Sequence, residues 1–516
     1  TAGAILLLSG ATPGVRSRLH FLDAFLPLTV MEFSHFMGSV AGAALLLLAW
    51  GLRRRLDAAY WLTSLVLLVG VVASLLKGGD FEEALFLSLV LTALIPSRRH
   101  FHRHASMTSD AFSPAWASAI ILVIGSTLWL GLFAFKHVDY SHEMWWEFAV
   151  RGDASRFLRA SVGVMTLLFV VALQRLMRPS VPRPETPSPV VLERVQAIVT
   201  ATRDVHANLA LLGDKSILFS DSGNAFVMYG AAGRSFVAMG DPVGPPRERQ
   251  ELSWQFRELA DRHGAATVFY EVRMHNLPLY LDLGLSLLKL GEEARVPLGD
   301  FSLHGGARKG MRRTVNQVEK DGGTFEIIPV ERVGDMLPQL RAVSDEWLET
   351  KKVREKGFSL GCWDDAYMRR NPMAVVQRNG QVVAFANLWR GQPGDELTVD
   401  LMRYSALAPD NVMEYLFIEL MLHGRAEGFS YFNLGMAPLA GLENRALAPL
   451  WNRVGALVYR FGENFYNFQG LREYKEKFDP VWEPRYLASP GGLMLPRILT
   501  NVSSLIAGGL TGIVAK

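Results

Sequence analysis

The sequence predicts an α-helical transmembrane bundle followed by a cytosolic α/β domain that is built from a repeated unit. Three observations lead to this prediction. Apolar residues concentrate before about Met177, while the rest of the 516-residue chain has the mixed charge of a soluble protein. Five prolines lie within residues 178–191 and favour an extended spacer over a helix. Beyond this spacer, one order of strands and helices occurs twice.

Charge and cysteine content limit the kinds of site and partner that the chain can have. A net charge of +3 is close to neutral, so arguments about charged partners depend on local clusters. The single cysteine, Cys362, excludes a disulfide framework and a cysteine metal cage, and it fits a reducing compartment. The chain begins at Thr1 inside an apolar run, which suggests a clipped chain without a signal peptide.

Five apolar stretches are long enough, or nearly long enough, to cross a bilayer as helices. They cover residues 36–52, 59–76, 83–95, 115–135 and 157–177, and residues 2–9 look like the end of a sixth span. The third stretch is short, which leaves a tilted or re-entrant helix open. The favoured role of this region is a membrane anchor, and a path for lipid is the alternative.

Arginines gather in the loops on one side of these spans, whereas acidic residues gather on the other side. By the positive-inside rule, everything after Met177 is predicted to be cytosolic. The arginine side holds Arg53, Arg54, Arg55, Arg98, Arg99, Arg103, Arg175, Arg178 and Arg183. His100, His102 and His104 alternate there and could bind a metal, but a solvated loop is favoured and no metal site is predicted.

The cytosolic part is predicted to contain two α/β modules, residues 192–304 and 305–490, followed by an amphipathic helix within residues 491–516. After a helix at 192–211, the first module has strands at 224–229 and 235–239, a helix at 247–263 and a strand at 267–272. The second has strands at 374–377, 382–389 and 396–402, a helix at 412–427 and a strand at 431–434. The apolar spacing of the last helix suits core packing or a bilayer surface equally.

This order of elements is also that of the acyltransferase (GNAT-like) fold that uses acetyl-coenzyme A. Such enzymes hold the cofactor's pyrophosphate in a glycine-rich loop at a helix N-terminus. The turn at residues 404–411 contains no glycine, and the turn at residues 240–246 has prolines in place of several N–H donors. Coenzyme A therefore fits both modules poorly, and no cofactor is predicted.

The most informative stretch runs from Glu396 to Ser405. Its spacing predicts a strand that breaks into a turn, which brings Asp400 and Arg403 to the mouth of a strand-to-helix connection. Irregular connections of this kind commonly carry the chemistry of α/β folds. From spacing alone, a functional pair and a structural ion pair are equally supported.

Three further groups of residues could meet anionic substrates. Residues 471–477 predict a short helix with Arg472, Lys475 and Lys477 near one region, and the aromatic lead-in at 465–470 suggests a lined pocket. Two basic clusters could contact RNA phosphates or an anionic membrane. They comprise Arg308, Lys309, Arg312 and Arg313, and Lys351, Lys352, Arg354 and Lys356. A plain solvated surface is the more common role of such clusters, and no base-reading motif indicates DNA.

Six strings together resemble the bacterial aminoacyl-phosphatidylglycerol synthases, also called multiple peptide resistance factors. They cover residues 207–215, 239–244, 354–361, 399–403, 433–439 and 465–478. The resemblance extends over essentially all of the chain from Leu192 onward. The membrane region has fewer spans than the family pattern, which suggests that part of the family's N-terminal region, and with it part of the flippase, is absent.

The resemblance implies transfer of an amino acid from aminoacyl-tRNA to the glycerol hydroxyl of phosphatidylglycerol, with alanine favoured and lysine as the alternative. It also implies a multi-pass protein of the bacterial cell membrane and resistance to cationic antimicrobial peptides. Asp400, Arg403 and Lys475 are then expected to be catalytic. Substrate contacts are expected from Glu355, Lys356, Ser359, Asn433, Tyr466, Asn467, Arg472 and Lys477.

Two rival functions remain at this stage. One is a membrane-tethered acetyltransferase that uses acetyl-coenzyme A, which thermal protection by the cofactor would support. The other is a flippase or transporter whose cytosolic part only regulates it, which would gain if Asp400→Ala spared aminoacyl-lipid formation while translocation failed. The sequence leaves the oligomeric state open, a homodimer included.

Overall fold

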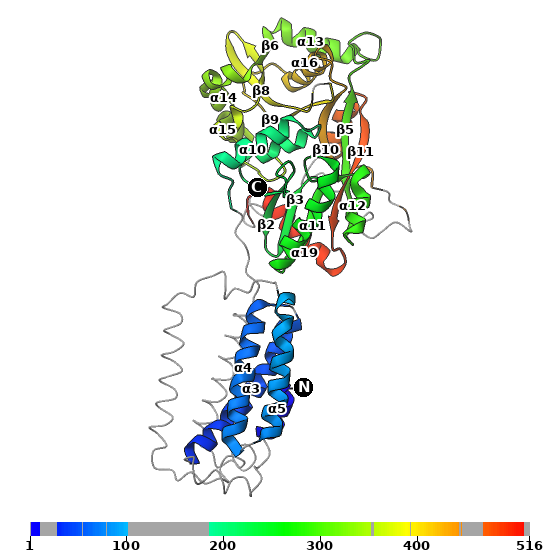
Figure 1. Ribbon diagram of the computed structural model, residues 1–516. Coiled ribbons are helices and arrows are strands. Elements are labelled where there is room, and N and C mark those ends of the chain that lie inside the picture. The colour runs from blue at the N-terminus through cyan, green and yellow to red at the C-terminus, as the bar shows by residue number, and fades with distance from the viewer. Residues whose placement is uncertain are drawn as a thin grey trace. The chain divides into compact units, whose positions relative to one another are not determined.

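The computed structural model describes residues 2–10, 28–53, 55–78, 80–101, 185–351, 355–392, 394–442, 445 and 468–509 (Figure 1). The chain divides into two compact units, and the division falls between Val181 and Pro182. Each unit has its own apolar core, so each is described by itself.

The described part of the N-terminal unit is helical. It contains α1 (Ala2–Gly10), α3 (Leu28–Arg53), α4 (Asp57–Gly78) and α5 (Phe81–Leu94), followed by the short η1 (Ile95–His100). Leu6, Leu45, Leu67 and Leu87 from these four helices form a buried cluster. The apolar side chains Trp61, Leu65, Leu68 and Val72 recur at helical spacing on α4 and are exposed.

One described helical segment, Asp57–Leu76, has the length and the apolar composition needed to cross a membrane. It corresponds to the span predicted at residues 59–76. A shorter apolar segment, Val40–Arg53, overlaps most of the span predicted at residues 36–52, and α5 covers most of the span predicted at 83–95. The spans predicted at 115–135 and 157–177 lie outside the described residues.

The second unit is an α/β domain with a mixed sheet of eleven strands, as predicted for a tandem GNAT-like domain. The first module provides β1 (Ser216–Phe219), β2 (Phe226–Ala232), β3 (Ser235–Met239), β4 (Ala266–Arg273) and β5 (Ser286–Pro297). The second provides β6 (Gly323–Ile328), β7 (Met373–Arg378), β8 (Gln381–Arg390), β9 (Glu396–Tyr404), β10 (Tyr431–Pro438) and β11 (Val481–Ser489).

Each module contains the same central unit. In the first, antiparallel β2 and β3 lead into α11 (Pro246–Arg262), which returns the chain to β4 parallel to β3. In the second, antiparallel β8 and β9 lead into α16 (Val412–Ala426), which returns it to β10 parallel to β9. The repeated order predicted from sequence is therefore confirmed for these elements.

The last strand of each module pairs with the other module. The strand order is β1-β2-β3-β4-β11-β5-β10-β9-β8-β7-β6. Thus β11 of the second module lies beside β4 of the first, and β5 of the first lies beside β10 of the second. Figure 1 shows β5 and β11 side by side on the right of this unit, and they are neighbours in the middle of the strand order. This strand exchange makes one continuous sheet out of two modules.

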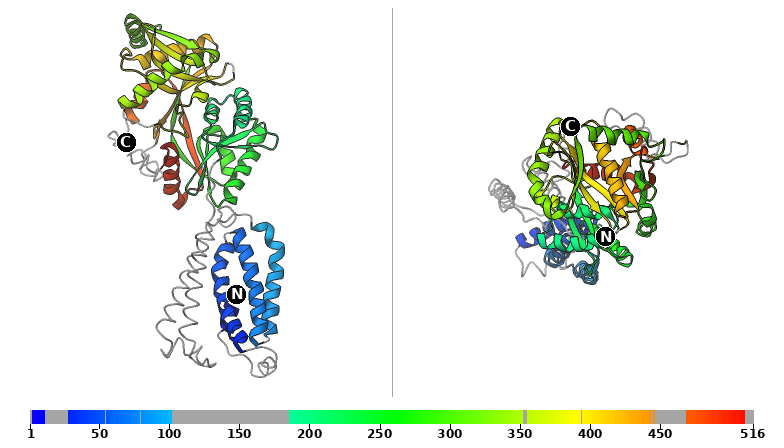
Figure 2. Two further views of the ribbon diagram at one scale, coloured as in Figure 1. Left: turned by 90° about the vertical axis from the view of Figure 1, so that its left-hand side faces the viewer. Right: turned by 90° about the horizontal axis from the view of Figure 1, so that it is seen from above.

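Helices cover both faces of this sheet (Figure 2). They include α10 (Pro189–Thr200), η2 (Val205–Leu212), η3 (Met274–Asn276), α12 (Leu277–Asp282), α13 (Lys309–Lys320), α14 (Val330–Lys351), α15 (Asp365–Met368), α18 (Phe468–Glu476), η5 (Gly492–Met494) and α19 (Leu495–Ile506). The largest apolar core joins side chains of both modules, among them Phe226 and Phe385. A core shared in this way makes the two modules one body.

Two helix predictions need correction. The helix expected at residues 192–211 is two helices, because α10 ends at Thr200 and η2 begins at Val205, where the Asp204 carboxylate caps its first turn. Helix α10 also starts inside the predicted spacer, with Pro189 at its first position, where proline needs no N–H partner.

The C-terminal helix α19 packs on the core. Its side chains Ile498 and Val502 belong to the shared core. The Asn501 amide, also buried, donates a 2.8 Å hydrogen bond to the Ser235 hydroxyl of β3. Of the two roles left open by the sequence, core packing is the one observed for this face.

Candidate functional site

Strand β9 carries Asp400 and Arg403, but it does not break into a turn where the sequence suggested. The strand continues to Tyr404, two residues beyond its predicted end, so Asp400 lies within the sheet and Arg403 is the next-to-last residue of the strand. Helix α16 begins at Val412, as predicted, after Asn411 in a left-handed conformation with φ of 63°. Arg403 therefore lies beside the strand-to-helix connection, as the sequence suggested, whereas Asp400 lies four residues before the end of the strand.

A β-bulge in β9 brings the two side chains to one segment. Ala386 of β8 pairs with Met402 and Leu388 pairs with Val399, so Asp400 and Leu401 together oppose Asn387. The Asn387 Oδ1 atom accepts a 2.7 Å hydrogen bond from the Leu401 N–H. A bulge of this kind changes the face to which the following residues point. As a result, Asp400 and Arg403, three residues apart, both contact the segment from Glu355 to Tyr367.

Both oxygens of Asp400 are held by hydrogen bonds. The Gly361 N–H donates to Oδ1 at 2.8 Å, and the Tyr367 hydroxyl donates to Oδ2 at 2.8 Å. The indole N–H of Trp389 in turn donates to the Tyr367 oxygen at 2.9 Å. Burial raises the pKa of Asp400, while the bonds from Tyr367 and Gly361 and the charge of Lys215 oppose the rise. A buried acid with a raised pKa is a candidate for proton transfer.

Arg403 supports the same segment. Its side chain is buried, and one Nη atom donates to both carboxylate oxygens of Glu355 at 2.8 and 2.7 Å. The other Nη atom donates to the Ser344 hydroxyl, and the guanidinium lies 5.4 Å from the centre of the Trp347 ring. These contacts join Arg403 to protein groups of α14 and of the segment that begins at Glu355.

Lys475 lies in a second buried cluster. Its Nζ atom donates to the carbonyl oxygens of Gly435 and Met436, both at 2.9 Å. The β5–β10 ladder is irregular between Asn433 and Met436, and the parallel β9–β10 ladder ends at the Asn433–Thr398 pair. Asp400 and Gly435 each follow that last pair by two residues. Lys475 is therefore bound to β10 just beyond its last pair with β9, whereas the side chain of Asp400 on β9 is bound to Gly361 and Tyr367.

Because burial lowers the pKa of Lys475 to about 8, the lysine should affect stability in a pH-dependent way. Between about pH 8 and the pKa that Lys475 has in the unfolded chain, the unfolded chain binds more protons than the folded chain. The free energy of unfolding of the wild type should therefore rise with pH. Relative to Lys475→Met, which lacks this group, the gain should approach about 1.4 kcal/mol per pH unit. Urea unfolding of both chains across this range measures it.

Lys477→Met is the matched control, since Lys477 is 53% exposed and pairs with Glu414 at the surface. Its stability difference from wild type should stay constant over the same range. A constant difference for Lys475→Met as well would contradict the lowered pKa.

A polar network that the sequence did not reveal joins the two modules. His206 of η2 contacts Glu293 of β5 at 2.7 Å, and the other Glu293 oxygen accepts from Arg485 of β11. Although burial works in the opposite sense, Arg485 and His206 lower the pKa of Glu293 well below its usual range. Burial alone would lower the pKa of His206, but the charge of Glu293 and its hydrogen bond raise this pKa overall. The network thus favours an ionised Glu293.

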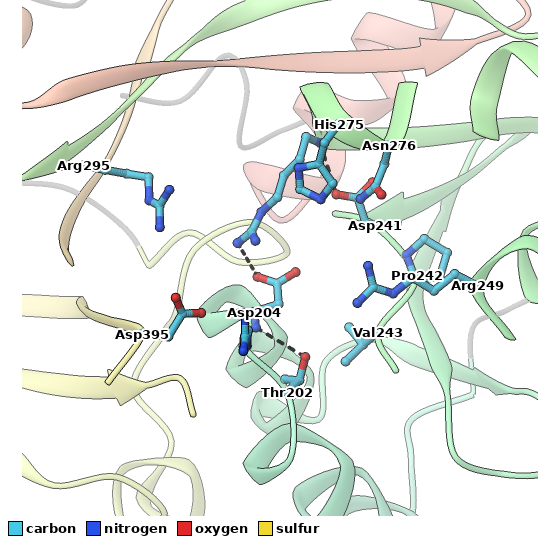
Figure 3. A pocket seen from close by; sticks show the side chains of 12 residues that line it. Thr202, Asp204, Asp241, Pro242, Val243, Arg249, His275, Asn276, Arg295 and Asp395 are labelled. Carbon is cyan, nitrogen blue, oxygen red and sulfur yellow. Dashed lines mark hydrogen bonds and ion pairs between the residues drawn. The ribbon is translucent and has the colours of Figure 1, made fainter. Parts of the chain in front are cut away.

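A cavity of about 320 Å³ lies beside this network (Figure 3). Its charged lining is largely paired: Arg273 donates to Asp204 at 2.8 Å, and Arg295 contacts Glu396 at 2.8 Å and Glu483 at 2.6 Å. Figure 3 shows Asp204 and Arg249 pointing into the cavity. Because its lining carries charges of both signs, the cavity is better suited to bind a polar ligand group with hydroxyls than a polyanion without them. The full lining is Thr202, Arg203, Asp204, Asp241, Pro242, Val243, Arg249, Arg273, His275, Asn276, Arg295 and Asp395.

The other predicted substrate residues are dispersed. Arg472 contacts Glu292 at 2.7 Å and lies over the Trp482 ring, whereas Lys477 contacts Glu414 at 3.0 Å, so α18 does not present its three cations to one region. Asn433 is fully buried and bonds to Glu396, which is a structural contact. Glu355 and Ser359 lie in the segment beside Asp400, and Lys356 is exposed there. Tyr466 and Asn467 lie outside the described residues.

The basic cluster around α13 is only partly available to a ligand. Arg308 pairs with Asp479 at 2.8 Å, and Arg312 donates to the carbonyl oxygens of Leu303 and Gly305. Lys309 and Arg313 are exposed and one turn apart on the helix. In the second cluster, Lys352 and Arg354 lie outside the described residues. Within the described parts of the chain, no group of three or more His, Cys, Asp or Glu side chains could hold a metal ion.

Comparisons with known proteins show which family the second unit resembles. The family model of the phosphatidylglycerol lysyltransferase C-terminal region matches residues 196–489. A phosphatidylglycerol lysyltransferase of Bacillus subtilis (strain 168) is 32% identical over 457 residues, which are 86% of this chain and 52% of that protein. One of Staphylococcus aureus (strain MRSA252) is 34% identical over 282 residues, which are 54% of this chain and 33% of that protein. The chain thus spans about half the length, or less, of these curated relatives.

Two solved structures are similar over the second unit. The C-terminal domain of a putative lysylphosphatidylglycerol synthetase from Agrobacterium fabrum has 43% identity and a TM-score of 0.57, and the match covers 62% of this chain and 97% of that chain. The structure of L-PGS from Bacillus licheniformis has 36% identity and a TM-score of 0.57, and the match covers 64% of this chain and 99% of that chain.

Proposed function

Because this chain belongs to the family defined by the C-terminal region of phosphatidylglycerol lysyltransferases, we propose that it transfers an aminoacyl group to phosphatidylglycerol. The donor in this proposal is an aminoacyl-tRNA. The names of the curated relatives point to lysine as the amino acid. The family resemblance described above favours alanine, so both donors are kept in this proposal. The observation that supports the chemistry best is Asp400, a partly buried acid with a raised pKa that a β-bulge aims at the Gly361 segment.

The reaction needs a base and no energy-supplying cofactor, because the tRNA ester is already activated. In the proposed step, the lipid hydroxyl oxygen attacks the ester carbonyl carbon and forms the new ester bond. The bond from that carbon to the ribose oxygen breaks. Asp400 takes the proton of the lipid hydroxyl and returns a proton to the ribose oxygen, so that the base is regenerated.

Lys475 is the second participant in this proposal. Its ammonium lies on β10, at the place where this strand parts from β9, and can stabilise the negative charge that develops on the ester oxygen. With a pKa lowered to about 8, the amine is still mostly protonated at neutral pH. Arg403 would act indirectly, since its contacts with Glu355 hold the segment that binds Asp400.

The N-terminal helices would hold the enzyme at the membrane that contains its acceptor lipid. We propose a multi-pass anchor that includes α3, α4 and α5, with the arginine-rich loops on the cytoplasmic side. Addition of an amino group makes the lipid less anionic, which would weaken the binding of cationic antimicrobial peptides to the cell. Lys309 and Arg313 of α13 are the exposed cations proposed to meet the tRNA.

The direct test is incubation of the purified chain with phosphatidylglycerol vesicles and either radiolabelled Ala-tRNA or Lys-tRNA. Label should appear in the extracted lipid with one donor or both, and it should be absent with phosphatidylethanolamine vesicles. Absence of labelled lipid with both donors would contradict the proposal. Thermal protection by acetyl-coenzyme A in that case would favour the acetyltransferase alternative.

A further inference from the structure

The first module places a buried ion pair beside Asp400 of the second module. Lys215 and Asp214 lie between η2 and β1, and the Lys215 side chain is 0% exposed. Its Nζ atom donates to the Leu209 carbonyl at 3.2 Å and to Asp214 Oδ1 at 2.5 Å. A lysine without solvent contact is costly to retain, which calls for a reason other than packing.

Asp214 uses its second oxygen to hold the segment that binds Asp400. The Phe358 N–H donates to Asp214 Oδ2 at 3.1 Å. Phe358 has a φ of 62°, a left-handed conformation that is unfavourable for an aromatic residue and persists only where its surroundings hold it. Its buried ring lies 6.0 Å from the Lys215 ammonium. Three residues later, Gly361 donates its N–H to Asp400.

The ammonium of Lys215 also acts on Asp400 by its charge. Burial lowers the pKa of Lys215, while the charges of Asp214 and Asp400 oppose this fall and favour the ammonium form. The ammonium in turn favours the ionised form of the Asp400 carboxyl, against the effect of burial on that acid. The other ionisable groups around the pair come from several elements. They are Glu355, Cys362 and Asp364 of the segment after α14, Tyr367 of α15 and Arg403 of β9. Arg403 is neutralised by Glu355, and Tyr367 binds Asp400 as a neutral donor.

We propose that Lys215 and Asp214 are positioning residues for the aminoacyl transfer, through which the first module orients the Asp400 carboxylate and keeps it ionised. This inference rests on the proposed function and adds a role for the first module to it. Asp214 fixes the strained Phe358 backbone and thereby the Gly361 N–H, and Lys215 supplies the positive charge. Neither residue touches a substrate in this account.

Lys215→Met separates this role from a structural one. Methionine fills similar space without a charge, so the variant should fold and be at least as stable as wild type. Without the ammonium, the pKa of Asp400 should rise. The acid limb of the kcat/KM profile for aminoacyl-lipid formation should then move to higher pH by about one unit, with a roughly tenfold loss below that limb and recovery at high pH.

Two comparisons sharpen the test. Lys320→Met removes an exposed lysine at the end of α13 and should leave the pH profile unchanged. Asp214→Asn removes the charge that pairs with Lys215 but keeps an oxygen that can accept from the Phe358 N–H. It should lower kcat/KM less than Asp214→Ala, which loses both contacts. Equal effects of the two Asp214 variants would contradict the role assigned to the Phe358 contact.

A readout without turnover separates this inference from the proposed function. Infrared titration of the carboxyl stretch, assigned to Asp400 by subtraction of the Asp400→Asn spectrum, reports the protonation of Asp400 in the 516-residue chain. Lys215→Met should raise that midpoint even if no lipid product forms with either donor, which would sink the proposed function alone. An unchanged midpoint and an unchanged pH profile would overturn the role of Lys215.

Discussion

Asp400→Asn is expected to lower kcat/KM for aminoacyl-lipid formation by about 10²- to 10⁴-fold. The amide cannot take the proton of the lipid hydroxyl, although it is close in size to the carboxylate. The Gly361 N–H can still bond to the amide oxygen, so the fold should survive. Wild-type activity should also fall as pH drops through the raised pKa of Asp400, because the base must be ionised. Steady-state assays with both substrates across pH measure these effects.

Asp410→Asn is the matched control. Asp410 is exposed on the connection between β9 and α16, ten residues after Asp400, and the same substitution there should leave activity within about twofold. Activity of Asp400→Asn close to that of wild type would remove Asp400 from the chemistry. The raised pKa would then reflect only a buried structural acid.

Gly361→Ala should reduce kcat/KM by about 10²-fold, a loss of the size seen when a reacting group is displaced by about 1 Å. A Cβ atom at position 361 would lie 1.7 Å from Asp400 Oδ2 and 2.5 Å from its Cγ. Contact at this distance is impossible, so either the carboxylate or the segment must move. The reaction would lose the alignment of its base, which steady-state kinetics and thermal unfolding can follow together.

The cause of this loss can be isolated with a double-mutant cycle. In an Asp400→Ala background the added methyl group has room, so the stability loss caused by Gly361→Ala should largely vanish. Gly299→Ala serves as the control, because no atom lies within 4 Å of a Cβ built there and its backbone is not left-handed. An equal stability loss from Gly361→Ala in both backgrounds would show that the clash is with some other group.

The sequence predicted the parts of the fold that follow regular apolar spacing. Strand β3 and helices α11 and α16 appear within a residue or two of their predicted limits, because each has one consistently apolar face. Strands β5 and β11 were missed, since Glu292, Glu293 and Arg485 interrupt their apolar pattern. These charges are tolerated only because they pair with one another or with neighbouring elements across the module boundary, which no local window contains.

The candidate site shows a similar limit. Spacing correctly suggested that Asp400 and Arg403 share surroundings, although the cause is a bulge in place of the expected turn. Lys215 and Tyr367 were not assigned a role, since a lone lysine or tyrosine in a sequence gives no sign of its burial. The Gly-Asp-Lys run at residues 213–215, which lies within one of the matching strings, was the available signal. Of the three cations predicted near one region, with Lys477 the least well aligned, Lys475 is buried, Arg472 pairs with Glu292, and Lys477, one residue beyond α18, pairs with Glu414.

The exchange of β5 and β11 also constrains how the protein can be made. Strand β4 ends at Arg273, and its neighbour β11 starts at Val481, so a ribosome must add about two hundred more residues before β4 gains its second partner. Until then a nascent chain exposes an open edge in the middle of its future sheet, where another chain could bind. Slow translation through the second module would prolong this exposure. A chaperone that holds the nascent chain would reduce the binding of other chains to this edge.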